Sequence, residues 1–142
     1  MTDEMLLLEN QLCFALVTAA RNVVSAYRPI LAPLGLTHPQ YLVMLALWER
    51  SPRSLSALAE EIAMEPATAS PLVKRLESQG LVTRERRAND ERHLDITLTT
   101  VGRALREKAL DVPPQVAAAT GLSLDQLTLI REALAPLAGR RA

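Results

Sequence analysis

Cysteine and histidine are scarce in this 142-residue sequence, which contains one cysteine and two histidines. A single cysteine excludes an internal disulfide and a cysteine-cluster metal site. The two histidines are far apart in the sequence, so we predict neither a metal site nor a bound cofactor. The five glycines form no phosphate-binding loop, and the Gly-x-Ser-x-Gly motif of a nucleophilic serine is absent. We therefore expect that the protein is not an enzyme.

Net charge and long apolar runs are absent as well. Sixteen lysines and arginines balance sixteen acidic residues, so the net charge identifies no partner. No run approaches the roughly 18 consecutive apolar residues of a membrane helix, and the N-terminal segment is acidic where a secretory signal is basic. Because 49% of the residues are hydrophobic, the chain can bury a core of its own. We expect a cytoplasmic protein of one domain with no membrane segment.

Apolar residues recur at helical spacing through most of the chain. The predicted helices span about residues 4–34, 37–50, 54–62, 67–79, 99–112 and 123–137. Thr37 with Gln40, and Ser123 with Gln126, have the spacing of capping boxes, which supports two of these helix starts. The first helix is apolar on several sides and is therefore expected to pack against more than one neighbour, including a second chain.

Prolines set further limits on the predicted helices. Pro29 and Pro33 should bend or end the first helix, and the pair Pro113-Pro114 should interrupt the fifth. Pro71 is tolerated if it lies in the first turn of the fourth helix, where backbone N–H groups have no partner. The fourth helix is therefore expected to begin near residue 67 or 68.

The apolar period changes to two after the fourth helix. Leu94, Ile96 and Leu98 alternate with polar residues, which predicts a strand with one buried face. Residues 81–86 are the expected antiparallel partner, and the polar residues 87–91 suit the hairpin turn.

Two short helices followed directly by a hairpin make a winged helix-turn-helix. The predicted fold class is mainly α with a small β-hairpin wing, in a single domain over residues 1–142. The winged helix-turn-helix covers about residues 37–99. The N- and C-terminal helices, about residues 1–36 and 100–142, flank it and are expected to form a homodimer.

A helix-turn-helix places the N-terminal part of its second helix in the major groove of double-stranded DNA. At that position Thr68 and Ser70 can bond to bases or phosphates. Lys74 and Arg75 follow about one turn later, where contact with phosphates is expected.

Arginines gather on the predicted wing. Arg84, Arg86 and Arg92 are candidate DNA contacts. An arginine at the tip, such as Arg92, can enter a narrow A·T-rich minor groove, and Asp90 can hold its guanidinium in place. The alternative interpretation is a solvated hairpin with incidental ion pairs.

The single cysteine, Cys13, has two interpretations. It is either a small buried hydrophobe or a reactive thiol, and a reactive thiolate needs hydrogen-bond donors or a helix N-terminus nearby. Tyr27 lies on nearly the same face of the predicted helix, but 14 residues span about 21 Å along a helix axis. The two side chains can therefore meet only between two chains whose first helices run antiparallel across a two-fold axis.

The region 54–98 resembles the winged helix of the MarR family, on the motif Leu-Glu-Ser-Gln-Gly-Leu-Val at 76–82 and Asp-Glu-Arg at 90–92. Within that family, several further segments resemble the organic hydroperoxide resistance regulators. These segments are residues 8–16, 27–29, 33–37 and 39–42. The resemblance extends from about Leu8 to Pro113.

The resemblance implies a homodimeric repressor that binds an inverted-repeat operator. Organic hydroperoxides oxidise the N-terminal cysteine of such a repressor to a sulfenic acid, and the DNA is released. By this resemblance Cys13 is the redox-sensing thiol, and Tyr27 hydrogen-bonds it from the other subunit.

The sequence departs from the subfamily pattern in two places. His38 replaces a second tyrosine of the cysteine site; it either donates a hydrogen bond to the thiolate and, if protonated, favours it electrostatically, or points to solvent. Val17 replaces a tyrosine that many relatives carry. Some members carry a second, resolving cysteine, but this chain resembles the one-cysteine type, so its sulfenic acid is expected to be capped by a small thiol or oxidised further.

Three other functions compete with this interpretation. The first is a MarR-type repressor that a small phenolic or lipophilic ligand releases, with Cys13 only structural. Residues that can line its pocket, or simply belong to the core, are Leu16, Tyr41, Met44 and Trp48. The second is a thiol peroxidase that uses Cys13, and the third is an adaptor that uses the wing for protein contacts.

Overall fold

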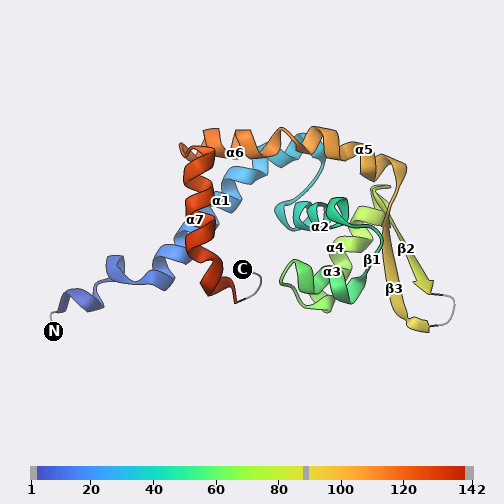
Figure 1. Cartoon of the computed structure of the whole chain (residues 1–142), viewed down its shortest axis with the longest axis horizontal. Helices are drawn as coiled ribbons and strands as arrows, with labels where there is room; N and C mark the ends of the chain where they lie inside the picture. The colour runs from blue at the N-terminus through green and yellow to red at the C-terminus, as the bar shows by residue number, and fades with distance from the viewer. Residues whose placement is uncertain (1–2, 88–89, 140–142) are drawn as a thin grey trace. The chain divides into compact units, whose positions relative to one another are not determined.

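The computed structural model describes residues 3–87 and 90–139, except for the side chains of residues 90–92. The chain divides into two compact units. Unit 1 consists of Met1–Ile30 and Val112–Ala142, and unit 2 consists of Leu31–Asp111. Figure 1 labels the helices and strands along the chain.

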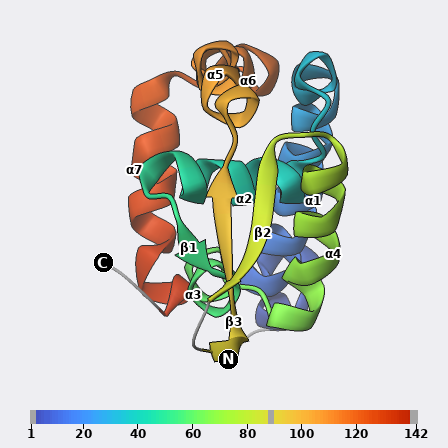
Figure 2. The ribbon, with the colours of Figure 1, turned by 90° about the vertical axis from the view of Figure 1, so that its right-hand side faces the viewer.

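Unit 2 is a winged helix-turn-helix, which confirms the predicted fold class. Its helices are α2 (His38–Glu49), α3 (Leu55–Glu61), α4 (Pro66–Ser78) and α5 (Thr100–Ala109), preceded by a 3₁₀ turn (Ala32–Leu34). Its strands are β1 (Arg53–Ser54), β2 (Val82–Arg87) and β3 (Asp90–Leu98). Helices α3 and α4 pack together as the helix-turn-helix, and β2 and β3 form the wing, where they run side by side in Figure 2.

Helix α2 forms the centre of the unit 2 core. It contacts α3, α4, α5 and β3, and half of its residues are buried. The largest fully buried side chains of unit 2 are Leu31, Val43, Met44, Leu47, Leu58, Val73, Leu76, Val82 and Ile96. Burial of this apolar surface provides most of the free energy that holds α4 and the wing against the core.

The sheet has three strands rather than the two that the sequence predicts. Strand β1 pairs with β3, with Arg53 opposite Ile96, so the order is β1-β3-β2. A two-residue strand has too few positions to show an alternating pattern. Arg87 and Asp90 lie in β2 and β3, which makes the hairpin strands longer than predicted, whereas residues 88 and 89 of the predicted turn lie outside the described residues.

Both predicted capping boxes are present. Thr37 accepts a hydrogen bond from the backbone N–H of Gln40 and donates its own backbone N–H to Gln40 Oε1 at 2.9 Å. Ser123 and Gln126 make the same pair of bonds at the start of α7 (Leu124–Leu134). These local bonds define the two helix starts.

The long first helix predicted over 4–34 is wrong at its N-terminal end, because α1 spans Leu12–Leu31. Two 3₁₀ turns, Asp3–Leu6 and Leu8–Asn10, precede it. The side-chain amide of Asn10 donates to the Glu4 carbonyl at 2.6 Å, and that of Gln11 donates to the Met5 carbonyl at 2.8 Å. These amides satisfy backbone carbonyls that a continuous helix would use, which offers the chain an alternative to the helix.

Two expectations about prolines are also corrected. Helix α4 begins at Pro66, so Pro71 lies inside the helix rather than in its first turn. Its ring is exposed, and the loss of one backbone hydrogen bond is offset by the buried side chains of the same helix. The pair Pro113-Pro114 lies in the first turn of α6 (Val112–Thr120), a helix that the sequence did not predict.

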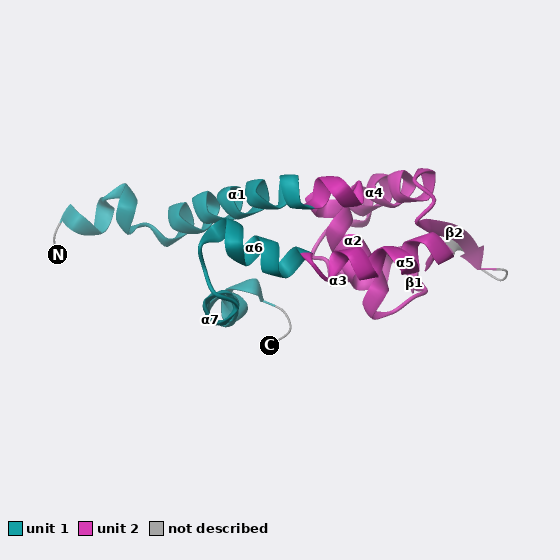
Figure 3. Cartoon of the chain, turned by 90° about the horizontal axis from the view of Figure 1, so that it is seen from above, with its two compact units in different colours: residues 1–30, 112–142 teal, residues 31–111 magenta. Residues whose placement is uncertain are grey.

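Unit 1 leaves most of its large apolar side chains exposed. It contains α1, α6, α7 and a final 3₁₀ turn (Ala135–Ala138), and it is coloured teal in Figure 3. Among its described residues, the buried apolar side chains are Ile30, Val112 and Val116. The exposed ones include Leu12, Phe14, Val17, Val23 and Val24 on α1 and Leu124, Leu129, Ile130 and Leu134 on α7. An apolar surface of this extent marks an interaction site.

No single helix of the described chain is long and apolar enough to cross a membrane. Helix α1 with its following 3₁₀ turn passes such a test only when it is counted together with α2 as a bent pair.

The end of β3 connects the wing to α2 through α5. Trp48 Nε1 donates to the Gly102 carbonyl at 2.9 Å, and the backbone N–H of Thr99 donates to the Leu81 carbonyl at 3.1 Å. A Cβ atom on Gly102 would lie 2.1 Å from the Leu81 carbonyl oxygen. Only glycine therefore allows α5 to approach the start of the wing this closely.

Gly102→Ala should destabilise unit 2. Replacing glycine by alanine within a helix normally adds about 0.5–1 kcal/mol of stability, but the clash with Leu81 should instead lower the free energy of unfolding by about 1–3 kcal/mol. Urea unfolding followed by the fluorescence of Trp48 measures this change. Arg103→Ala, at the exposed neighbouring position, is the control, and a stabilised Gly102→Ala variant would contradict the packing described.

Candidate nucleic-acid interface and thiol site

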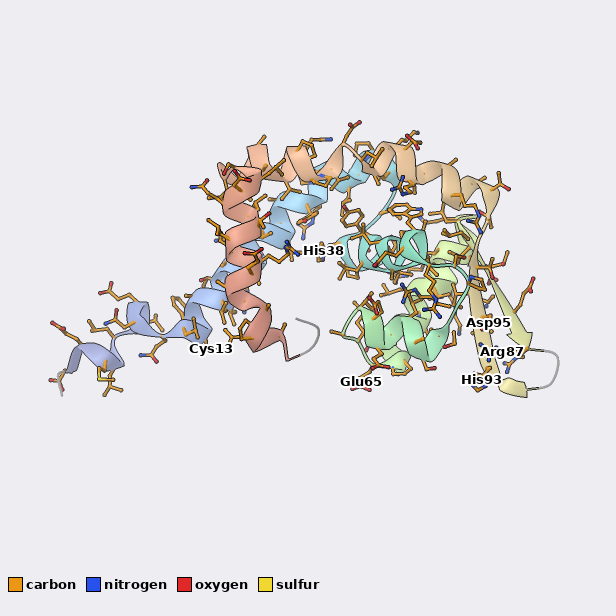
Figure 4. The ribbon with its side chains drawn as sticks, in the orientation of Figure 1. Cys13, His38, Glu65, Arg87, His93 and Asp95 are labelled. Carbon is orange, nitrogen blue, oxygen red and sulfur yellow. The ribbon has the colours of Figure 1, made fainter. Side chains whose placement is uncertain are left out.

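Helix α4 presents the predicted reading residues to solvent. Ala69, Val73 and Leu76 are buried and attach one face of the helix to the core. On the remaining surface Thr68, Lys74 and Arg75 are exposed, and Ser70 is half-buried. Glu65 precedes the helix (Figure 4), and its side chain makes no capping bond. The exposed face can therefore contact a ligand without disturbing the core.

The wing arginines have different environments. Arg84 is half-buried and forms an ion pair with Glu77 of α4, with Nε at 3.0 Å from Oε1. The other carboxylate oxygen of Glu77 accepts the backbone N–H of Arg84 at 3.1 Å. Arg86 is exposed, whereas the side chains of Asp90 and Arg92 lie outside the described residues. Arg84 thus joins β2 to the end of α4.

A second ion pair stabilises the wing across its two strands. Arg87 Nε donates to both carboxylate oxygens of Asp95, at 3.1 and 3.3 Å, and Figure 4 labels both residues. Neither Asp95 nor Glu77 was predicted as a site residue. Their roles depend on strand register and on the approach of α4 to β2, which no local sequence pattern reports.

Cys13 is exposed in the single chain and is the second residue of α1 (Figure 4). It therefore lies in the first helical turn, where backbone N–H groups lack acceptors within the helix. Tyr27 is half-buried on the same continuous helix, about 21 Å further along the axis. Burial raises the pKa of the Tyr27 phenol, so the hydroxyl keeps its proton near pH 7 and remains a donor.

His38 is the first residue of α2 and is half-buried. Burial lowers the pKa of its imidazole below the usual 6.5, so the ring is neutral near pH 7. Of the two actions that the sequence suggests for His38, hydrogen-bond donation is therefore favoured over a positive charge. His38 belongs to unit 2, whereas Cys13 and Tyr27 belong to unit 1.

Of the four residues that could line a ligand pocket, Leu16 lies on α1 of unit 1 and the other three lie in unit 2. Tyr41 and Met44 are buried in the core, and Trp48 bonds to Gly102. The described part of the chain contains no group of three His, Cys, Asp or Glu side chains placed to hold a metal ion.

Known proteins resemble this chain over most of its length. The model of the MarR family matches residues 36–94. The organic hydroperoxide resistance transcriptional regulator of Bacillus subtilis is 40% identical over 127 residues, which cover 89% of this chain and 86% of that protein.

Solved structures show the same likeness. Reduced AbfR of Staphylococcus epidermidis bound to DNA has a TM-score of 0.79 and 34% identity, over 98% of this chain and 97% of that one. BpsR of Bordetella bronchiseptica, whose DNA binding is regulated by 6-hydroxynicotinic acid, has a TM-score of 0.78 and 26% identity, over 87% of this chain and 96% of that one.

The ion pair between Glu77 and Arg84 gives a test of the interface. Glu77→Gln should weaken DNA binding about fivefold at constant salt, because the wing loses its link to α4, a pair worth about 1 kcal/mol. Glu85→Gln is the control, since it removes the same charge from an exposed side chain next to Arg84. Electrostatic repulsion alone predicts tighter binding for both variants, so a tighter Glu77→Gln complex would contradict the positioning role.

Proposed function

The chain belongs to the MarR family of DNA-binding transcriptional regulators, and we propose that it is a dimeric repressor which an organic hydroperoxide releases from DNA by oxidising Cys13. One observation carries the proposal. The only cysteine of the sequence is exposed at the start of α1, in a chain that is 40% identical to an organic hydroperoxide resistance regulator. The relatives are transcriptional regulators and not enzymes, so the thiol peroxidase has no support from them.

The proposed DNA contacts follow from the winged helix. The N-terminal part of α4 enters the major groove with Thr68 and Ser70, while Lys74 and Arg75 contact phosphates. The wing arginines contact the flanking DNA, and Arg84 also keeps the wing in place through Glu77. Two such readers related by a two-fold axis require an inverted-repeat operator.

The exposed apolar side chains of α1 and α7 support the proposed dimer. Covering them with a second copy removes a large apolar surface from water. An isologous contact between antiparallel α1 helices places Cys13 of one subunit near Tyr27 of the partner subunit. The Tyr27 hydroxyl then donates a hydrogen bond to the Cys13 thiolate, an arrangement that a single chain cannot achieve.

The sensing reaction is a two-electron oxidation of sulfur. The Cys13 thiolate attacks the terminal oxygen of the hydroperoxide, so that an S–O bond forms and the O–O bond breaks. The leaving alkoxide takes up a proton and departs as an alcohol, and Cys13 becomes a sulfenic acid. A small thiol can then displace water from the sulfenic sulfur to form a mixed disulfide, because the chain has no second cysteine to do so.

Release of the DNA follows from the location of Cys13 at the proposed interface between subunits. A bulkier and more polar group at the interface between two α1 helices alters how the subunits pack. The spacing of the two readers then no longer matches the two half-sites, which must be about one helical turn of DNA apart.

A ligand-released repressor is the second candidate, and the likeness to BpsR favours it. In that case Cys13 only packs, and DNA binding responds to a small phenolic or lipophilic molecule instead of to peroxide. The two candidates therefore differ in which small molecule weakens DNA binding.

Cys13→Ser tests the sensing role. The variant should bind its operator as tightly as the reduced wild type, because serine is nearly isosteric with cysteine and position 13 lies outside unit 2, which contains the DNA reader. It should lose the response to organic hydroperoxide, because a hydroxyl is not oxidised under these conditions. Fluorescence anisotropy of labelled operator DNA, before and after peroxide, measures both properties. Continued release of the serine variant would remove Cys13 from the mechanism.

Tyr27→Phe tests the contact between subunits. Loss of a hydrogen bond to a charged group should slow the oxidation of Cys13 about tenfold, without changing DNA affinity in the reduced state. The decisive sample is a mixed dimer of a Cys13→Ser chain with a Tyr27→Phe chain, in which the one remaining Cys13 faces a wild-type Tyr27 only across the interface. Its oxidation, followed by stopped-flow kinetics, should proceed at the wild-type rate. A slow rate would show that Tyr27 does not act between subunits.

A further inference from the structure

The C-terminal end of α4 is connected to the start of α2 by side-chain amides. Gln79, which follows α4 directly, donates from Nε2 to the Gly35 carbonyl at 2.7 Å. Its Oε1 accepts a hydrogen bond from Gln40 Nε2 at 3.4 Å. One side chain therefore contacts both the turn before α2 and the first turn of α2 itself.

Gln40 is held firmly at its end of this connection. The residue is 5% exposed, and among the described residues it is the one polar residue that is buried. Its Oε1 accepts the backbone N–H of Thr37 in the capping box, and its Nε2 points to Gln79. A buried amide group that loses its hydrogen-bond partner lowers the stability of the fold. The bond between Gln40 and Gln79 therefore favours one position of the end of α4 relative to α2.

Gln79 is not part of the apolar core, because its side chain is exposed. The core attachment of α4 comes from Ala69, Val73 and Leu76, which are fully buried. Apolar packing of this kind is non-directional, so it holds the helix against the core without specifying its orientation as hydrogen bonds do. Two polar connections at the C-terminal end of α4 supply that direction, one from Glu77 to the wing and one from Gln79 to α2.

We propose that Gln79 is a positioning residue of the DNA reader, which couples the segment from Gly35 to Gln40 to the orientation of α4. A displacement of this segment, which includes His38, then changes the angle at which Thr68 and Ser70 meet the major groove. The inference rests on the proposed DNA binding, but it does not depend on peroxide sensing.

The test uses Gln79→Met, which keeps the length of the side chain and removes the amide. The full-length reduced protein is titrated with a duplex of its own upstream region and with a scrambled duplex of equal length, at one salt concentration. The affinity for the upstream duplex should fall about tenfold, while the affinity for the scrambled duplex stays unchanged. The Tm should fall by about 4–8 °C, because the buried Gln40 loses one hydrogen-bond partner while the apolar core is untouched.

Two further variants sharpen the result. Ser78→Ala is the matched control. Among the described residues the Ser78 hydroxyl bonds to the Lys74 carbonyl of its own helix at 3.1 Å, so this variant should leave both affinities unchanged. Gln79→Glu places a carboxylate oxygen against the Gly35 carbonyl oxygen, where the two acceptors repel, so its loss of preference should be at least as large as that of Gln79→Met. An unchanged preference in Gln79→Met, or a parallel loss of both affinities, would overturn the positioning role.

The experiment separates this inference from the proposed function. A wild-type protein that prefers the upstream duplex but ignores peroxide would contradict the sensing mechanism and leave the role of Gln79 intact. A wild-type protein with no preference for the upstream duplex would overturn both.

Discussion

Cys13 and Tyr27 lie on one continuous helix, α1, and this constrains how they can act together. The helix separates them by about 21 Å, so any contact between the thiol and the phenol requires a second chain. The same unit leaves the apolar side chains of α1 and α7 exposed, which gives a second chain a surface to bind. A sensing site shared between subunits is therefore also a site that can change how the subunits pack. In the proposed mechanism this is the link between the oxidation of one sulfur atom and the spacing of two readers on DNA.

The reader unit combines an apolar core with a few directional polar contacts. Helix α2 is buried at the centre, and α3, α4 and β3 pack around it. Ion pairs of Glu77 with Arg84 and of Arg87 with Asp95 hold the wing, and the amides of Gln40 and Gln79 connect α4 to α2. These contacts lie at the edges of the core, where small changes in orientation have large effects on DNA contacts. In the proposed coupling, the start of α2 is the part of unit 2 whose displacement reorients the reading helix.

Local features of the fold could be predicted from the sequence, and non-local ones could not. Helical periodicity and the two capping boxes involve residues within four positions of each other, so they are visible in the sequence. The pairing of β1 with β3 depends on segments that meet only after folding. The same holds for the ion pairs of Arg84 with Glu77 and of Arg87 with Asp95. Pro113-Pro114 reads equally well as the end of one helix or the start of the next, which is why α6 was missed.

Thr68, Lys74 and Arg75 were placed correctly on the exposed face of α4 because Ala69, Val73 and Leu76 define its buried face. The role of each of these residues at DNA stays a prediction.

The most direct test of the account is one DNA titration of the wild-type protein in three states. The protein is titrated with its own upstream region when reduced, after treatment with an organic hydroperoxide, and after a small thiol is added to the oxidised sample. The account predicts tight binding, then release, then recovery of binding, with mass spectrometry placing the modification on Cys13. DNA binding that is unchanged by peroxide while Cys13 is fully oxidised would contradict it.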